Sequence, residues 1–356
     1  MQTRRDDIRA LNDSDLTELC VELGQPPYRA RQISEWLWKH RVSDIAEMTS
    51  LPARLRETLA ERFEIRAARA DDVQKSSDDS VKVAYTLHDG EIVEGVLIPG
   101  SDGRRSTACI SSQVGCSLRC AFCATARIPV RRNLDAGEIV DQVDDLNRRS
   151  LNELGRSLTN VVYMGMGEPL ANYAEVVRSI RLLTSKIGFG MAARRITLST
   201  AGLAEQMHAL ADEAIGINLA LSLHSATDSV RRSLMSSARD WSLDQLADAV
   251  RYWHSKHGKP VTFEYLLLAG HNDSADEARA LARFASRLPC KINLIEYNPV
   301  IGIPFSAAEH SVTDRFAGIL ARSGVTVTVR RSSGRDIDAA CGQLAGRRSP
   351  SRNAVT

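Results

Sequence analysis

Three cysteines within eight residues constrain this chain more than any other feature of its sequence. Cys116, Cys120 and Cys123 stand in the run Cys-Ser-Leu-Arg-Cys-Ala-Phe-Cys, with the spacing C-x3-C-x2-C. Thiolates are the usual ligands of iron–sulfur clusters, and ferredoxin-type electron carriers normally supply four of them. Three can therefore hold a four-iron, four-sulfur (4Fe-4S) cluster while leaving its fourth iron open to a second cofactor. The run thus favours chemistry at the cluster over simple electron transfer.

Two other interpretations of the cysteine run compete with this one, a zinc site and a chance cluster of cysteines. Zinc sites usually combine two pairs of Cys or His ligands and need a fourth ligand. The sequence offers none at a suitable spacing near residues 116–123. The spacing instead resembles the signature of radical S-adenosylmethionine (radical-SAM) enzymes, in which the amino-acid part of SAM binds the open iron.

Length and composition indicate an ordinary soluble protein with one large domain and a smaller addition. The chain has 356 residues, of which 25% are charged and 43% hydrophobic. It has no apolar run long enough to span a bilayer, and its start lacks the apolar stretch of a signal peptide. We therefore expect a cytoplasmic protein with no membrane contact, whose seven cysteines serve metal or redox chemistry rather than a disulfide framework.

The charge pattern leaves nucleic-acid binding open. A net charge of +2 neither requires nor excludes it. Arg127, Arg131 and Arg132 follow the cysteine run, and arginine pairs stand at 194–195 and 330–331. Clustered arginines near an active site can bind phosphates, although a single arginine is more often a solvated surface group.

Four segments are predicted along the chain. Residues 1–68 form a small helical N-terminal domain, with a helix N-cap in the run Asn12-Asp-Ser-Asp15 and Gly24 and two prolines as a break. This domain either binds RNA or gives structural support to the main domain. Residues 69–103 form a β-hairpin linker with an Asp-Gly turn at 89–90, residues 104–345 form the core, and residues 346–356 form a mobile basic tail.

The core alternates short apolar strands with amphipathic helices. Such alternation predicts an α/β fold with a parallel sheet, here a partial (β/α) barrel. Functional groups of such barrels lie at the C-terminal ends of the strands, and the cysteine run follows the first strand. The expected strands are 108–114, 160–164, 195–199, 217–223, 261–268, 291–297 and 325–329, with helices at 173–185, 243–257 and 275–286 among those between them.

Polar residues follow several of these strands. Glu168 ends a Met-Gly-Met-Gly-Glu-Pro run and offers a carboxylate to the ammonium group of SAM. Ser199, Ser222 and His224 stand where a ribose or carboxylate of SAM can be held, and Asn298 can bond its adenine or ribose. Each has a plainer interpretation as a turn residue or a satisfied structural group. Their coincidence on one rim is what favours a binding site.

Several blocks of the sequence together closely resemble the RlmN/Cfr family of radical-SAM RNA adenine methyltransferases. These are residues 109–116, the cysteine run, and residues 164–169, 222–224, 290–295 and 336–344. The resemblance implies a partial radical-SAM barrel with one 4Fe-4S cluster, held by Cys116, Cys120 and Cys123, and SAM used in two roles. It further implies an adenosine of 23S ribosomal RNA as methyl acceptor, with transfer RNA as a second candidate. An external one-electron reductant such as flavodoxin or ferredoxin and a monomeric state are expected.

The resemblance also assigns roles to individual residues. Cys341 would carry the methyl group, Cys109 would resolve the covalent intermediate by forming a disulfide with Cys341, and Glu94 would accept the proton. Glu91 competes with Glu94 because glutamates alternate on this strand, and Cys20 and Cys290 are assigned to packing. The residues that would line the SAM site are Gly167, Glu168, Ser199, Ser222, Leu223, His224 and Asn298.

Chemistry supports this division of labour. An aromatic adenine carbon is too weak a nucleophile to take a methyl group directly from SAM, so a radical route is needed. The family route first methylates the Cys341 thiolate, then turns that methyl into a radical that adds to adenine. Cys109 finally releases the RNA by thiol–disulfide exchange.

Departures from the family pattern leave the target carbon, C2 or C8, open. They stand at Ser236-Ser-Ala-Arg239, Glu296 and residues 126–129. Two rival functions are a radical-SAM enzyme acting on a peptide or small molecule, and a non-catalytic RNA-binding relative.

Overall fold

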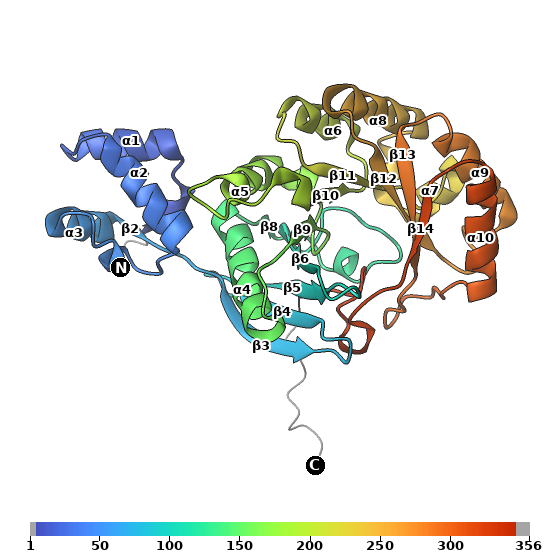
Figure 1. The fold of residues 1–356 in the computed structure, drawn as a ribbon, viewed down its shortest axis with the longest axis horizontal. Coiled ribbons are helices and arrows are strands. Elements are labelled where there is room, and N and C mark those ends of the chain that lie inside the picture. The colour runs from blue at the N-terminus through green and yellow to red at the C-terminus, as the bar shows by residue number, and fades with distance from the viewer. Residues whose placement is uncertain (1–4, 347–356) are drawn as a thin grey trace, which may run out of the picture.

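A ten-stranded sheet runs through the larger part of the chain, and its parallel strands confirm the predicted partial barrel (Figure 1). The computed structural model describes residues 5–346. The strand order is β14-β13-β12-β11-β10-β9-β6-β5-β4-β3, so β14 and β3 are edges and the sheet does not close on itself. The parallel strands are β6 Ser106–Ile110, β9 Asn160–Tyr163, β10 Ile196–Thr200, β11 Asn218–Ser222, β12 Val261–Leu267, β13 Cys290–Glu296 and β14 Val327–Arg330.

Helices between the parallel strands cover the outer face of the sheet (Figure 1). Apolar strand residues such as Leu198, Leu219 and Phe263 are completely buried, which explains why the sequence showed these strands as short apolar runs. Within the described residues, no helix is both long and apolar enough to cross a membrane. The helices are α4 Ala136–Leu154, α5 Tyr173–Thr184, α6 Ala204–Asp212, α7 Asp228–Leu234, α8 Leu243–His257, α9 Ala275–Ala285 and α10 His310–Arg322.

The prediction of one strand over 108–114 is wrong. Strand β6 ends at Ile110, because Ser111 donates its backbone N–H to Oε1 of Gln142 (2.9 Å) and Ser112 donates to the carbonyl of Met166 (2.8 Å). Residues Gln113–Val114 form a separate strand, β7, paired with β8 Arg132–Asn133. The cysteine loop therefore lies between β7 and β8, directly beyond the C-terminal edge of the sheet.

The predicted hairpin is part of the same sheet. Strands β4 Val81–Thr86 and β5 Ile92–Pro99 pair antiparallel, and Gly90 takes φ +84° in the predicted turn. A further strand, β3 Arg69–Lys75, was not expected. Its sequence is mostly charged and polar and its side chains are largely exposed, as suits a sheet edge. Residues 69–103 thus extend the sheet of the core, while of the predicted tail only Gly346 is described.

The N-terminal helices lie beside the sheet, next to α4 and α5 (Figure 1). Asn12, in the expected run, caps the first helix through a capping box with Asp15. Residues 23–27 then separate α1 from α2, at the predicted break. The elements are β1 Asp6–Asp7, α1 Asp13–Glu22, α2 Tyr28–Glu35 with a π-helical turn Trp36–His40, α3 Ala53–Arg62 and β2 Phe63–Glu64.

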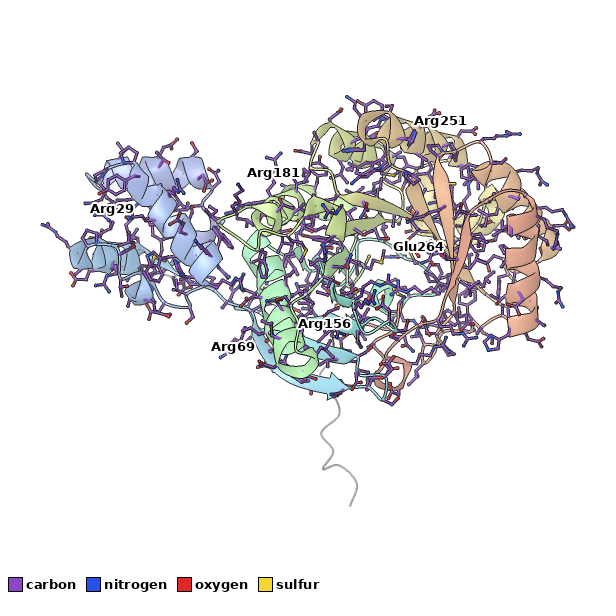
Figure 2. All side chains as sticks on the ribbon, in the orientation of Figure 1. Arg29, Arg69, Arg156, Arg181, Arg251 and Glu264 are labelled. Atoms are coloured by element: carbon purple, nitrogen blue, oxygen red, sulfur yellow. The ribbon has the colours of Figure 1, made fainter. Side chains whose placement is uncertain are left out.

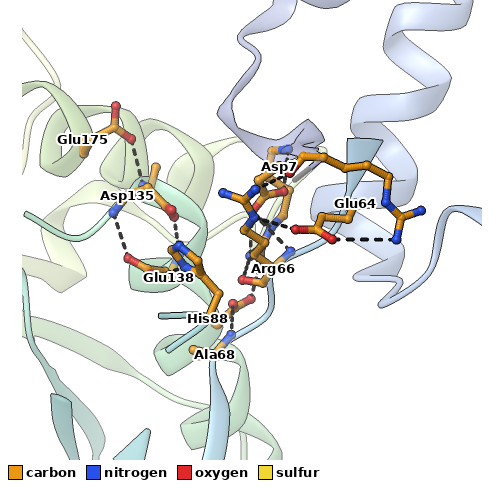
Figure 3. A network of polar contacts seen from close by, with 12 residues as sticks. Asp7, Glu64, Arg66, Ala68, His88, Asp135, Glu138 and Glu175 are labelled. Atoms are coloured by element: carbon orange, nitrogen blue, oxygen red, sulfur yellow. Dashed lines mark hydrogen bonds and ion pairs between the residues drawn. The ribbon is translucent and has the colours of Figure 1, made fainter. Parts of the chain in front are cut away.

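A buried arginine joins the N-terminal segment to α4. The guanidinium of Arg9 lies 2.8 Å from Oδ1 of Asp141 and 3.3 Å from Oδ2 of Asp7, and its side chain is only 5% exposed. Figure 3 shows the surrounding contacts in two groups, with Asp7 bound to the N–H of Arg66 in one and Asp135 bound to the N–H of Glu138 in the other. A buried charge pair of this kind fixes the relative position of the two parts.

We expect Arg9→Met to destabilise the protein by about 3 kcal/mol, because it leaves two carboxylates buried beside α4 without their cation. Urea unfolding measures the change, and limited proteolysis near residue 67 reports loosening of the N-terminal part. Arg31→Met is the control, since the side chain of Arg31 is 76% exposed and its ion pair with Glu35 should contribute less than about 0.5 kcal/mol. Equal stability of the two variants would contradict the docking role.

Candidate active site

One cavity at the C-terminal edge of the parallel strands gathers most of the predicted site residues. Ten of the thirteen line it, and they come from the cysteine loop, from the ends of four strands and from the C-terminal segment. The three remaining residues, Glu94, Leu223 and Asn298, do not line it. Those on its wall are Cys109, Cys116, Cys120, Cys123, Gly167, Glu168, Ser199, Ser222, His224 and Cys341.

The three cysteines of the loop have the character of a cluster-binding set. Cys116 and Cys120 are partly buried, and this burial raises the pKa of Cys116 to about 12 and that of Cys120 well above its usual value. Within residues 5–346, no three Cys, His, Asp or Glu side chains converge enough to hold a single metal ion. A 4Fe-4S cluster takes each thiolate on a different iron, so its ligands stand farther apart than those of zinc. Three thiols on one cavity wall, each able to bind a different iron, fit a cluster.

Cys341 reaches this cavity on a C-terminal segment tied down at several points. The carbonyl of Gly342 accepts a hydrogen bond from Ala124 (2.8 Å), and the carbonyl of Leu344 accepts one from the Thr125 hydroxyl (2.7 Å). At the start of the segment, Oδ2 of Asp336 accepts a hydrogen bond from the N–H of Ser77 (3.0 Å), in the turn between β3 and β4. Residues far apart in sequence thus hold Cys341 beside the cysteine loop.

Cys109 faces the same cavity from β6 and shares a cation with Cys341. Burial raises the pKa of Cys109 to about 12, a negative charge on Cys341 raises it further, and Arg330 opposes both effects. Arg330, at the end of β14, also has its pKa raised, first by Cys341 and then by Glu264. The curved sheet therefore brings its first and last parallel strands together around the two thiols.

Glu168 is a buried carboxylate with no cation of its own within the described residues. One of its oxygens accepts a hydrogen bond from Leu170 (3.0 Å) and the other from Ala201 (2.8 Å). Burial raises its pKa. Gly167 before it has φ +97°, and a Cβ there would stand 2.6 Å from Cβ of Gln113, so only glycine fits this turn. The site thus offers a dry negative group to an ammonium ion.

His224 is held as a neutral hydrogen-bond donor. Its Nδ1 accepts a hydrogen bond from the N–H of Leu266 (3.0 Å), which leaves the proton on Nε2. Burial, and the charge of Arg231, lower its pKa to about 3. The ring packs edge-on against Phe122 of the cysteine loop, with 4.9 Å between ring centroids.

Comparisons with known proteins agree with this geometry. The family model of the ribosomal RNA large subunit methyltransferase N-terminal domain matches residues 7–65, and that of the radical SAM superfamily matches residues 110–285. The chain is 45% identical to a probable dual-specificity RNA methyltransferase RlmN of Christiangramia forsetii, over 98% of either chain. The chain belongs to the RlmN family.

A second RlmN relative and a solved structure support the assignment. The dual-specificity RNA methyltransferase RlmN of Anaeromyxobacter dehalogenans is 42% identical over 97% of this chain and 93% of its own. The crystal structure of a radical SAM methyltransferase from Sphaerobacter thermophilus has a TM-score of 0.89 at 41% identity, covering 96% of this chain and all of that one. A 4Fe-4S cluster and SAM are accordingly the cofactors of this RlmN-family chain.

Three residues with roles implied by the RlmN resemblance lie off the cavity wall. Leu223 is fully buried in the hydrophobic core, on the opposite face of the chain from Ser222 and His224. Asn298 is 1% exposed and donates to Oγ of Ser332 (2.8 Å), while its Oδ1 has no partner. Glu94 accepts hydrogen bonds from Ala345 (2.7 Å) and Gly346 (3.1 Å), which cover it.

Two charged residues of the cavity wall were not predicted as part of the SAM or cysteine site. Glu264 was not considered, and Arg330 was considered only as a phosphate ligand. Glu264 is 6% exposed, accepts a hydrogen bond from Nδ2 of Asn293 (2.7 Å) and lines the cavity. In Figure 2 it lies among the strands, whereas Arg29, Arg181 and Arg251 lie at the periphery. A lone carboxylate inside the apolar run 261–268 was the available signal.

Proposed function

We propose that this chain transfers a methyl group to an aromatic carbon, C2 or C8, of an adenosine in RNA. The reaction runs through a methylated Cys341 and a covalent protein–RNA intermediate. The observation that carries the proposal is the meeting of Cys341, Cys109 and the three loop cysteines around one cavity. A second pair of thiols beside a cluster site suits a reaction in which one sulfur carries a group and the other releases it.

Cys341 and Cys109 have consecutive tasks in this proposal. The bound cluster and SAM supply two reagents, a methyl group for polar transfer and a radical that abstracts hydrogen. Cys341 accepts the methyl group on its sulfur, and the guanidinium of Arg330 stands on the same cavity wall. After the sulfur-bound carbon has joined adenine, the adduct gives up its ring proton and its unpaired electron, for which the oxidised cluster would be the acceptor. The Cys109 thiolate then attacks the sulfur of Cys341, the carbon–sulfur bond breaks, and the released carbon takes up a proton to become the methyl group. An external dithiol reductant returns the resulting disulfide to two thiols.

The remaining wall residues orient SAM. Glu168 is the proposed partner of its ammonium group, and the Nε2–H of His224 the proposed donor to its carboxylate or ribose. Gly167, Ser199 and Ser222 line the same side, and Leu223 and Asn298 could contribute only through backbone or after rearrangement. Glu94 can act as proton acceptor only once residues 345–346 have moved from its carboxylate.

Fewer of the arginines after the cysteine run are free to bind RNA phosphates than the sequence suggested. Arg132 is engaged with Asp89 and Glu138, and Arg127 donates to the carbonyls of Ile301 and Gly302. Arg131 has a side chain that is 65% exposed, and within residues 5–346 it forms a single ion pair, with Glu91 at 3.2 Å. It is therefore the first candidate for a phosphate contact.

The proposal also includes a reductant, a cellular compartment and an oligomeric state. The cluster needs an external one-electron reductant of the flavodoxin or ferredoxin type. The thiol chemistry of Cys109 and Cys341 requires a reducing compartment, for which the cytoplasm is the proposal. We propose that the protein acts as a monomer on 23S ribosomal RNA, with transfer RNA as a second acceptor.

Mass spectrometry of nucleosides tests the function. The reconstituted protein is incubated without oxygen with ribosomal RNA, transfer RNA, a reductant and SAM carrying a trideuterated methyl group. We expect labelled 2-methyladenosine or 8-methyladenosine in which one deuterium per methyl group has been lost. That loss reports the hydrogen abstraction, and the nucleoside identifies the carbon.

Two results would favour the rival functions. SAM cleavage without labelled adenosine in either RNA, together with no RNA binding, would indicate a peptide or small-molecule substrate. RNA binding by a protein that takes up no iron and sulfide under anaerobic reconstitution would indicate a non-catalytic relative.

A further inference from the structure

Arg231, on α7, is a completely buried arginine without a carboxylate partner. Its exposed fraction is 0%, and it lines no part of the cavity. Its Nη2 donates to the carbonyl of Ala201 (2.8 Å) and its Nη1 to that of Trp241 (3.4 Å), while its Nε has no partner. Within residues 5–346 it forms no ion pair. Arg9, the other deeply buried arginine described above, has two carboxylates.

The side chain lies directly behind the cysteine loop. The carbonyl of Leu234, at the end of α7, accepts a hydrogen bond from Ala121 (2.9 Å), and Oγ of Ser236 accepts one from Arg119 (2.9 Å). The loop carrying Cys120 therefore rests on the helix that carries Arg231.

The group that Arg231 binds is part of the cavity wall. Ala201, whose carbonyl accepts from Nη2 of Arg231, lines the cavity and belongs to the apolar cluster against which Cys120 and Cys123 pack. Burial lowers the pKa of Arg231 to about 10, and negative charge at Cys120 and at Asp228 opposes this effect. A thiolate at Cys120 belongs to the cluster-bound protein, because iron binding displaces the thiol proton. Without the cluster the buried guanidinium binds two carbonyl oxygens, and the charge of Asp228 offsets the cost of burial only in part, because the pKa of Arg231 stays lowered.

We propose that Arg231 is the counter-ion of the iron–sulfur cluster, raising its reduction potential and tying cluster binding to the stability of the barrel. A 4Fe-4S cluster on three thiolates carries a net negative charge, which grows when one electron arrives from the external reductant. A fixed positive charge in a water-free setting stabilises the reduced form more than the oxidised form. Arg231 acts through the cluster and touches no substrate, so it is a positioning residue.

The test measures the cluster itself, in the absence of RNA. Arg231→Gln, Arg231→Lys and the control Arg232→Gln are reconstituted anaerobically, and the reduced fraction is followed by electron paramagnetic resonance during a redox titration. Arg232 is the next residue of α7 and is exposed, so its substitution removes the same charge from the surface. We expect the ratio of reduced to oxidised cluster at a fixed potential to fall about tenfold in Arg231→Gln. Arg231→Lys and the control should stay close to the parent protein.

Thermal unfolding with and without the cluster gives a second measurement. If Arg231 is the counter-ion, the stabilisation that cluster binding confers is smaller in Arg231→Gln than in Arg231→Lys. An unchanged potential in Arg231→Gln, with equal losses of stability in both forms, would make Arg231 a purely structural link and overturn the proposal. So would failure of Arg231→Lys to bind iron while it stays folded. The proposal rests on the cluster as cofactor, and these results hold whichever RNA is methylated.

Discussion

Replacing Cys341 by serine should lower RNA methylation at least about 10³-fold while cleavage of SAM continues. A serine hydroxyl stays protonated near neutral pH and is a far weaker nucleophile toward a methyl group than a thiolate. SAM cleavage depends on the loop cysteines and Glu168, whose contacts the substitution leaves in place. The two activities separate because the residue that carries the methyl group is distinct from those that bind the cofactors.

The measurement follows 5′-deoxyadenosine by chromatography and methyladenosine by mass spectrometry in one anaerobic reaction. Cys290→Ser is the matched control, since Cys290 begins β13 outside the cavity and its thiol lies 3.6 Å from the carbonyl of Ala285. It should retain both products. Full methylation by the Cys341 variant would show that another group carries the methyl, and the two-cysteine proposal would fail.

The sequence could predict the barrel because most of its parallel strands bury apolar residues against the helices. Strands such as β10 and β12 appear as short apolar runs bounded by amphipathic helices, and they form within about two residues of the predicted limits. Strand β3 was not predicted, because it has no apolar run. It lies at an edge, is mostly polar, and becomes a strand only because β4 offers it hydrogen bonds.

In the candidate site, too, residues identified by a local sequence pattern were predictable, and residues that depend on the folded sheet were not. Cys116, Cys120 and Cys123 are adjacent in sequence, so spacing alone identifies them. The position of Leu223 depends on which face of the chain turns inward, and alternation after β11 sends Ser222 and His224 to the cavity and Leu223 to the core. Arg330 reaches Cys109 only because the sheet curves, which no local pattern records.

Replacing Cys109 by alanine should make a covalent protein–RNA adduct accumulate and lower repeated turnover at least about 100-fold. Methylation of Cys341 and joining to adenine do not need Cys109, so the reaction proceeds to the adduct. Release then fails because no other free thiol lines the described cavity, the remaining three being the proposed cluster ligands.

The adduct is detected with end-labelled RNA on a denaturing gel, and digestion should give a nucleotide attached to the peptide containing Cys341. Cys20→Ala removes an equally buried thiol from the N-terminal helices and should keep full turnover. Slow release on addition of an external thiol would support the assignment, because it replaces the missing attack. Normal turnover in the Cys109 variant, with no adduct, would show that RNA leaves by another route.

The fold indicates which sulfur moves during this release. Cys109 lies in β6, paired with Val96 of β5 on one side and Val162 of β9 on the other, so its backbone is held within the sheet. Cys341 lies on a segment outside the strands, held by single hydrogen bonds such as that between Ala124 and Gly342. Disulfide formation should therefore displace residues around 341, and the same motion would uncover Glu94. Hydrogen exchange at Ala345 and Gly346 should accordingly quicken when Cys109 and Cys341 are oxidised.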